Sequence, residues 1–303
     1  MRRLMAIGWA LALLMISART THAAVIPLLQ PANVGSQLIF YYDTRDGFTT
    51  FVNLNQVSSG PVTVRVEFYG PSLGGNPPTQ AYNLEPFETR VIDVGALKET
   101  IGLPAQQGIA VAYATNEATE PIEYPALSGN FTVANLATGS AWGAPAPARS
   151  ARIATNGATA PLGAVVDANQ VVYESIQPTL LTLAAYYDPQ TLAPVSAHGN
   201  QVIFVSLKSA TSKGAFLTAS STAWTIDGAG RGGGPPIFTT VPVSGVVEFD
   251  LVSLVGEAAN GAAGGLIFST TGAPIDESRF IFFVQSLGTF GTGYLLPPIP
   301  RVF

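Results

Sequence analysis

Residues 62–68 have the sequence VTVRVEF, in which apolar and polar residues alternate without a break. The four even-numbered residues are apolar and the three odd-numbered residues are polar. Because successive side chains of a strand point to opposite faces, this pattern predicts a β-strand with one buried face. Strands of this kind are typical of antiparallel sheets that have one face on a core and one in solvent.

Similar short runs flank this stretch and are separated by turn residues. They lie near residues 38–42, 49–55, 79–84, 89–94, 109–113 and 130–136. About seven short strands in the first half of the chain predict two packed antiparallel sheets. One short helical turn is expected between strands at residues 93–100, and another at residues 250–258.

The chain also repeats its own pattern in five blocks that keep the same order. LIFYYD at 38–43 returns as LAAYYD at 183–188, and VNLN at 52–55 matches VSLK at 205–208. RVIDV at 90–94 matches VEFDL at 247–251, GIAV at 108–111 matches GLIF at 265–268, and residues 139–149 match 291–301. We therefore predict two tandem domains that arose by internal duplication. The first covers residues 24–149, a linker covers 150–170, and the second covers 171–303.

The first 23 residues have the features of a cleavable secretory signal peptide. Arg2 and Arg3 precede an apolar run at residues 4–16, and Thr21-His22-Ala23 offers small residues for cleavage after Ala23. This run is shorter than the ~20 residues that span a bilayer. The sequence therefore predicts a secreted bacterial protein, at the cell surface, in the periplasm or outside the cell, without a transmembrane segment after cleavage.

Three stretches of the first repeat carry a resemblance to a known class of module. They are TFVNLN at 50–55, VTVRVEFY at 62–69 and LEPFETRVID at 84–93. In this succession the chain resembles the immunoglobulin-like β-sandwich modules of bacterial secreted and surface proteins. The resemblance implies an all-β sandwich architecture and transfers no catalytic residues. The disulfide and buried Trp of antibody domains have no counterpart here.

Composition excludes several kinds of chemistry. The chain has no cysteine, and His198 is its only histidine beyond the predicted signal peptide, so Cys/His zinc sites, Cys–His nucleophile pairs and haem ligation are excluded. The net charge of −5 makes nucleic acid an improbable partner. The glycine-rich stretch at 227–234 lacks the Lys and Ser or Thr of a phosphate-binding loop. We predict no catalytic residue and no cofactor, with His198 in an exposed loop.

Acidic residues leave one question about metal binding open. Asp43 and Asp46 flank Arg45, which stands where a calcium loop needs an oxygen ligand, so an Asp-Gly turn is the better interpretation. Glu117, Glu120 and Glu123 gather in one loop, with Asp276-Glu277 at the corresponding place in the second repeat. The sequence predicts no metal-ligating residue but does not decide whether the loop around Glu117, Glu120 and Glu123 binds calcium.

Two tyrosine pairs, Tyr41-Tyr42 and Tyr186-Tyr187, bear on carbohydrate binding. Neighbouring residues of a strand face opposite ways, so one tyrosine of each pair is expected to face outward. An exposed Tyr could stack on a sugar ring, as could Trp142, although tyrosine is also favoured in strands for structural reasons.

These observations favour a secreted, non-enzymatic protein with a structural, adhesive or assembly role. The alternative is a carbohydrate-binding module that uses exposed aromatic residues, and a third hypothesis is a hydrolase with an unrecognised carboxylate pair. Expected partners are proteins or further copies of the chain, joined by strand addition, or a glycan. The apolar residues 24–30 are candidates for such strand addition, although a first strand of their own domain is the preferred interpretation.

Overall fold

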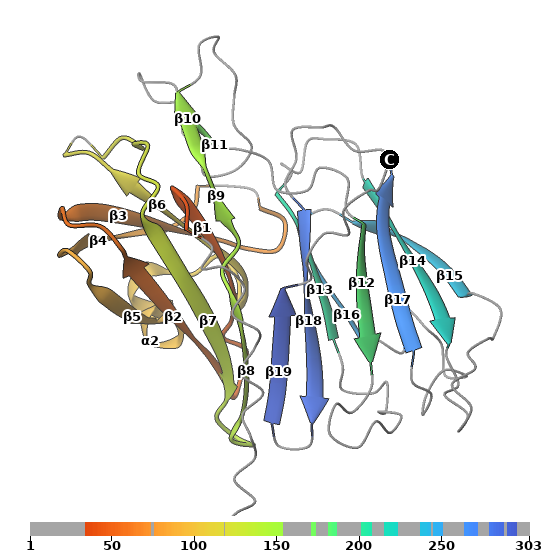
Figure 1. Ribbon diagram of the computed structural model, residues 1–303. Helices are drawn as coiled ribbons and strands as arrows, with labels where there is room; N and C mark the ends of the chain where they lie inside the picture. The colour runs from red at the N-terminus through yellow and green to blue at the C-terminus, as the bar shows by residue number, and fades with distance from the viewer. Residues whose placement is uncertain are drawn as a thin grey trace, which may run out of the picture. The chain divides into compact units, whose positions relative to one another are not determined.

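The computed structural model describes residues 34–73, 76–117 and 119–153 and, further on, the individual strands named below (Figure 1). The fold is all-β, as predicted, with several antiparallel sheets and one helix among the described residues. No helix in the described part of the chain has the length and apolarity needed to cross a membrane.

The first half forms the predicted strands and two more. They are β1 (Gln37–Asp43), β2 (Phe48–Gln56), β3 (Val62–Tyr69), β4 (Thr79–Leu84), β5 (Thr89–Asp93), β6 (Gln107–Thr115), β7 (Leu127–Asn135), β8 (Ser140–Pro145) and β9 (Ala148–Arg149). The last two were not predicted from the sequence. β8 pairs with β7 and β9 pairs with β1, so both strands belong to the first half.

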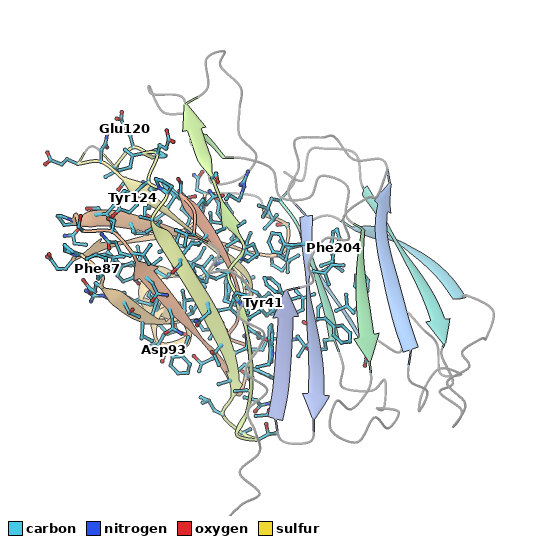
Figure 2. All side chains as sticks on the ribbon, in the orientation of Figure 1. Tyr41, Phe87, Asp93, Glu120, Tyr124 and Phe204 are labelled. Atoms are coloured by element: carbon cyan, nitrogen blue, oxygen red, sulfur yellow. The ribbon has the colours of Figure 1, made fainter. Side chains whose placement is uncertain are left out.

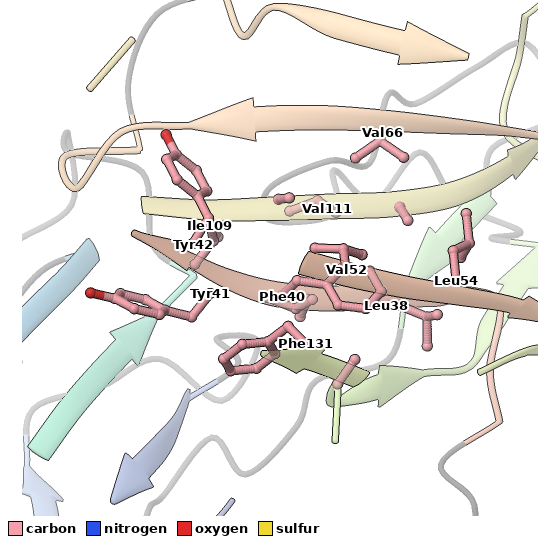
Figure 3. Close-up of a cluster of buried hydrophobic side chains, with 14 of the residues drawn as sticks. Leu38, Phe40, Tyr41, Tyr42, Val52, Leu54, Val66, Ile109, Val111 and Phe131 are labelled. Atoms are coloured by element: carbon pink, nitrogen blue, oxygen red, sulfur yellow. The ribbon is translucent and has the colours of Figure 1, made fainter. Parts of the chain in front are cut away.

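The strands of the first half form two sheets, in the orders β4-β3-β6-β1-β9 and β5-β2-β7-β8. Leu38, Phe40 and Val66 of the first sheet share a hydrophobic cluster with Val52 and Leu54 of the second (Figure 3). The alternating pattern of β3 is confirmed, because its four even-numbered apolar residues are buried. Two facing sheets with a shared core make this half a β-sandwich.

The single helix, α2 (Val94–Ile101), follows β5 where a helical turn was predicted. The carboxylate of Asp93 accepts a hydrogen bond from the backbone N–H of Ala96 at 3.1 Å, which caps the first turn. Gly102 ends the helix with φ of 62°, a conformation that glycine adopts at little cost. The second predicted turn, at 250–258, lies outside the described residues except for Asp250.

The second half repeats this strand order. Its strands are β12 (Leu181–Tyr186), β13 (Gln201–Ser206), β14 (Ala215–Ala223), β15 (Ile237–Val243), β16 (Gly245–Asp250), β17 (Gly264–Thr271), β18 (Arg279–Leu287) and β19 (Phe290–Leu295). The sheets have the orders β12-β17-β14-β15 and β16-β13-β18-β19. These correspond strand for strand to β1-β6-β3-β4 and β5-β2-β7-β8.

The ladder registers correct one of the predicted block alignments. The repeat matches Asp93 to Asp250. In the ladders Asp93 pairs with Phe51 and Asp250 pairs with Gln201, so Phe51 corresponds to Gln201. The block at 52–55 is therefore offset from its counterpart by 150 residues rather than by the predicted 153. An odd shift moves every side chain of a strand to the opposite face. Asn53 therefore corresponds to Ile203, and Asn55 to Val205.

Within sheet β4-β3-β6-β1-β9, the neighbouring strands β1 and β6 are buried on both faces. All seven residues of β1 are buried, including Ile39 and Tyr41 on the face turned away from the sandwich core. Ile203, Val205 and Phe282 of the second half belong to the same hydrophobic cluster. The backbone N–H of Val246 also donates to the carbonyl of Pro71 at 2.9 Å. We infer that sheet β16-β13-β18-β19 covers this face, so an apolar interface joins the two halves.

The strand order departs from the immunoglobulin arrangement in its outer strands. As in an immunoglobulin domain, the second strand pairs with the fifth and the third with the sixth. Here, however, the first strand pairs with the sixth and the seventh with the second. The central pairs are therefore shared with that fold, whereas the first, fourth and seventh strands lie in the opposite sheet.

The ends of the predicted linker, 150–170, are joined by a short ribbon. β10 (Ala151–Ile153) pairs antiparallel with β11 (Val171–Tyr173), the first residues of the predicted second domain. Residues 154–170 between them lie outside the described part of the chain, as do the predicted signal peptide and residues 24–30.

Candidate binding surface

Three loops meet at one end of the first sandwich. They are residues 57–61 between β2 and β3, residues 85–88 between β4 and β5, and residues 116–126 between β6 and β7. The ladders bring their flanking residues together, because Gln56 pairs with Leu127 and Val62 with Leu84. Figure 2 shows Phe87, Tyr124 and Glu120 at this end. Loops held on a rigid scaffold are frequent sites of binding.

Gln56 holds the three loops in a fixed arrangement. Its side-chain amide is buried and donates to the hydroxyls of Ser58 at 3.0 Å and Tyr124 at 2.7 Å. Its carbonyl oxygen accepts hydrogen bonds from the backbone N–H groups of Ser58 at 3.0 Å and Phe87 at 2.9 Å. One buried side chain therefore contacts all three loops, and the loop end is preorganised.

Phe87 occupies a strained position in the loop between β4 and β5. The N–H of Glu88 donates to the carbonyl of Glu85 at 3.0 Å, which closes a four-residue turn. Pro86 cannot adopt a positive φ, whereas Phe87 has φ of 60°, so the turn is of type II with Phe87 at the position that favours glycine. A side chain in this conformation costs about 1–2 kcal/mol. The ring is nevertheless 70% exposed.

The loop end is acidic. Its three loops contain Glu85, Glu88, Glu117, Glu120 and Glu123 and no Lys, Arg or His. Glu88 accepts a hydrogen bond from the backbone N–H of Glu85 at 2.8 Å and forms an ion pair with Arg90 of β5 at 2.6 Å. The backbone hydrogen bond, followed by the charge of Arg90, lowers the pKa of Glu88.

Glu117, Glu120 and Glu123, for which the sequence left calcium binding undecided, lie in the loop between β6 and β7. Glu120 accepts a hydrogen bond from the side-chain amide of Asn116 at 2.9 Å, and its N–H donates back to that amide's oxygen at 2.9 Å. Glu123 is exposed. Among residues described by the structure, no three His, Cys, Asp or Glu side chains gather in a way that could hold a metal ion.

The expectation that one tyrosine of the first pair faces outward is wrong. Tyr41 and Tyr42 are both buried, because β1 is covered on both of its faces. The Tyr41 ring stacks on half-buried Trp142 at 5.7 Å, and the Tyr42 hydroxyl donates to the carbonyl of Tyr69 at 3.1 Å. These aromatic residues are therefore engaged inside the protein rather than presented to a sugar.

A polar cluster joins the two halves. Arg45 donates to the buried carboxylate of Asp43 at 2.6 Å and lies 3.3 Å from Glu248. Gln107 donates to Glu248 at 2.6 Å and to the Tyr41 hydroxyl at 2.9 Å. Desolvation is the largest single effect and lowers the pKa of Arg45, but the hydrogen bond and charge of Asp43, together with the charges of Glu248 and Tyr41, outweigh it and raise this pKa. The predicted Asp-Gly turn therefore contains an ion pair between Asp43 and Arg45.

A second buried carboxylate is also engaged by neighbouring side chains. Glu67 accepts hydrogen bonds from the hydroxyls of Tyr69 and Tyr113, both at 2.6 Å. Desolvation, followed by the nearby charge of Glu67, raises the pKa of Tyr113. Desolvation is also the largest cause of the raised pKa of Tyr41. Glu67, Tyr69 and Tyr113 therefore form a hydrogen-bonded cluster on the same face of the sheet as Tyr41.

Several predicted features lie outside the described residues. They are His198, Tyr187, Asp276, Glu277 and the glycine-rich stretch at 227–234. Sequence reasoning missed Phe87, although Glu85-Pro86-Phe87-Glu88 carried a usable signal. Proline at the second position of a turn followed by a bulky residue, rather than glycine, marks a possible strained turn.

Comparison with known proteins yields little. No protein-family model matches the chain, and no curated protein matches it significantly. Among solved structures, the chain is similar to one described as the crystal structure of PBSX exported protein XepA, with 10% sequence identity and a TM-score of 0.20. The alignment covers 82% of this chain and 81% of that one. A likeness of this size supports no conclusion about the present chain.

Proposed function

We propose that this chain is a secreted, non-enzymatic protein with a structural, adhesive or assembly role at the bacterial surface. Its two halves are copies of one β-sandwich module, immunoglobulin-like in its central strand pairs and doubled by internal duplication. The matching strand orders of the two halves support the duplication, as do the five repeated sequence blocks. The signal-like residues 1–23 support secretion.

The observation that carries the proposal is the joining of the two halves through an apolar face and a polar cluster. Phe282 of the second half lies against Phe131 of the first, with ring centroids 5.0 Å apart, and Glu248 lies against Arg45 and Gln107. An interface that is largely apolar disfavours relative motion of the joined parts. A fixed two-sandwich unit is suited to presenting a binding surface at a set position, which adhesion and assembly require.

The carboxylates near this interface have structural partners. Asp43 bonds to Arg45, and Glu67 bonds to two tyrosines. On the outer side of the sandwich, Asp93 caps α2 and accepts a hydrogen bond from Thr49 at 2.7 Å. Such roles favour a scaffold over the hydrolase hypothesis, which requires carboxylates that face a substrate.

A secretion and retention experiment tests the proposal. The full chain is expressed with and without residues 1–23, and the medium, periplasm and cell surface are assayed for the protein. We expect export only with these residues, retention on cells or matrix, and no turnover of glycoside, ester or peptide substrates. Turnover abolished by one carboxylate substitution, or a protein that stays in the cytoplasm, would contradict the proposal.

The carbohydrate-binding alternative now depends on a different aromatic residue. Tyr41 and Tyr42 are buried and Trp142 is half-buried against Tyr41, whereas Phe87 is 70% exposed. Saturable binding on a glycan array that is lost in Phe87→Ala would favour this alternative.

A further inference from the structure

Strand β5 lies at the edge of its sheet. Its only ladder partner is β2, and no strand in the described part of the chain pairs with its outer edge. An edge strand presents a row of backbone N–H and C=O groups that another extended chain can bind. Proteins usually protect such edges with charged side chains, prolines or bulges.

β5 is poorly protected and carries apolar side chains. Val91, in the middle of the strand, is 59% exposed, and Phe87, two residues before the strand begins, is 70% exposed. Arg90 is the one charged side chain in the middle of β5, and Glu88 neutralises it at 2.6 Å. By contrast, the exposed residues of β4, an edge strand of the facing sheet, are Thr79, Ala81 and Asn83, and none is a large apolar residue.

Phe87 differs from an ordinary exposed residue because its backbone has a strained, positive φ. Glycine would fit the turn without the cost of a side chain at positive φ. The backbone N–H of Phe87 donates to buried Gln56 at 2.9 Å, so the backbone that carries the exposed ring is held in place. Strained residues of this kind cluster at ligand-binding sites.

The charges near β5 indicate the chemistry of the partner. Glu85 and Glu123 are exposed in loops that contain no basic residue. Acidic groups around an apolar anchor favour a partner that combines basic and aliphatic side chains. The free backbone edge favours a polypeptide over a glycan, because only a polypeptide matches the spacing of a strand's donors and acceptors.

The geometry points to β5 as a docking edge for an extended, basic segment of a partner protein. The segment adds as a further strand beside β5, its aliphatic side chains contact Val91 and Phe87, and its Lys or Arg side chains face Glu85 and the acidic loops. This inference extends the proposed assembly role by naming a surface and a partner class. Its test uses purified protein and does not depend on where the protein is located.

Binding of a labelled peptide tests the inference. The probe is an eight-residue peptide of alternating Lys and Val, titrated with the full mature chain and followed by fluorescence anisotropy. We expect saturable binding that weakens about tenfold in Phe87→Gly and in Val91→Lys. Phe87→Gly should also raise the melting temperature, because it relieves the strain at this position. Leu136→Ala is the matched control, because Leu136 is 69% exposed at the opposite end of the same sandwich.

Two further peptides separate strand addition from other modes of binding. A Glu-Val peptide of the same length tests the charge requirement, and a Lys-Val peptide N-methylated at alternate residues tests backbone pairing. Both should bind at least tenfold more weakly. Equal binding of the N-methylated peptide, equal loss in Leu136→Ala, or no binding of the Lys-Val peptide at millimolar concentration would overturn the inference. So would oligomers of the chain that Val91→Lys dissolves, because the occupant would then be a second copy.

Discussion

Two corresponding sheets, β5-β2-β7-β8 and β16-β13-β18-β19, share one strand order but present opposite chemistry on their outer faces. In the first sheet this face carries Asn53 and Asn130, joined by a hydrogen bond of 2.6 Å. In the second sheet the equivalent positions hold Ile203 and Phe282, both buried. The outer face of the sheet is therefore solvated in the first half and covered in the second, and side chains rather than strand order decide which.

The largest expected effect comes from placing a polar residue on the covered outer face of sheet β16-β13-β18-β19, as found on the open outer face of sheet β5-β2-β7-β8. Phe282→Asn should lower the free energy of unfolding by about 3–5 kcal/mol, because it removes a buried ring and buries an amide without a partner. Urea unfolding measures this cost. The reverse change at the equivalent open position, Asn130→Phe, should cost less than about 1 kcal/mol. Equal costs at the two positions would mean that the second sheet is not covered.

Alkaline pH tests the same interface from the first half. Burial raises the pKa of Tyr41 and Tyr113, which lie on the covered face, above the ordinary value of 10.0. The unfolded chain releases these protons above about pH 10 while the folded chain keeps them. Stability is therefore full below pH 10, and each further pH unit removes about 1.4 kcal/mol per tyrosine until the folded-state pKa is reached.

Spectroscopic titration measures this effect. Absorbance of tyrosinate at 295 nm should rise for exposed tyrosines first, and the buried tyrosines should ionise only together with the loss of β-sheet circular dichroism. Ionisation of all ten tyrosines near pH 10 with the sheet signal intact would show that the face is open to solvent.

The polar cluster between the halves should contribute less than the apolar face. Arg45→Ala leaves the buried carboxylate of Asp43 without its ion pair, and we expect a loss of about 1–3 kcal/mol. Arg90→Ala is the matched control, because the Arg90–Glu88 pair has a similar distance but is more exposed to solvent, and it should cost less than Arg45→Ala. Thermal melting of both variants makes the comparison, and equal shifts would assign the cluster no role in joining the halves.

The smallest change in stability is expected for a double substitution that places the apolar residues of the covered face at the equivalent positions of sheet β5-β2-β7-β8. Asn53→Ile with Asn130→Phe should leave the fold intact, because both side chains already face outward. The new apolar face should instead cause concentration-dependent association. In the second half, the equivalent apolar face packs against sheet β4-β3-β6-β1-β9, whereas the new face has no such sheet to pack against. Sedimentation velocity measures it, and a variant that stays monomeric would show that the apolar face alone is not sufficient for packing.

Local sequence pattern predicted the strands of the first sandwich well. The alternation in 62–68 and the turn residues between the runs were sufficient to place seven strands and α2, because burial of one face imposes a period of two. β8 was missed because Gly143 and Pro145 break the pattern. Gly143 is nevertheless required where it lies, since a Cβ there would come within 2.5 Å of the carbonyl of Phe131.

The candidate surface was only partly predictable. The glutamates of the loop between β6 and β7 stood out in the sequence, whereas the approach of Phe87 to Gln56, 31 residues earlier, depends on how two strands pair. The burial of Tyr41, by contrast, could have been predicted. Its strand contains LIFYYD, and an unbroken apolar run indicates a strand that is covered on both faces.

The sequence by itself determined the all-β class, the positions of most strands and the repeated pattern, because these depend on the order of apolar, polar and turn residues along the chain. Only the tertiary structure decided the register between the repeats, the face that each sheet buries and the residues that meet at the loop end. These depend on contacts between residues far apart in the chain, and a shift of one residue in register exchanges the two faces of a strand.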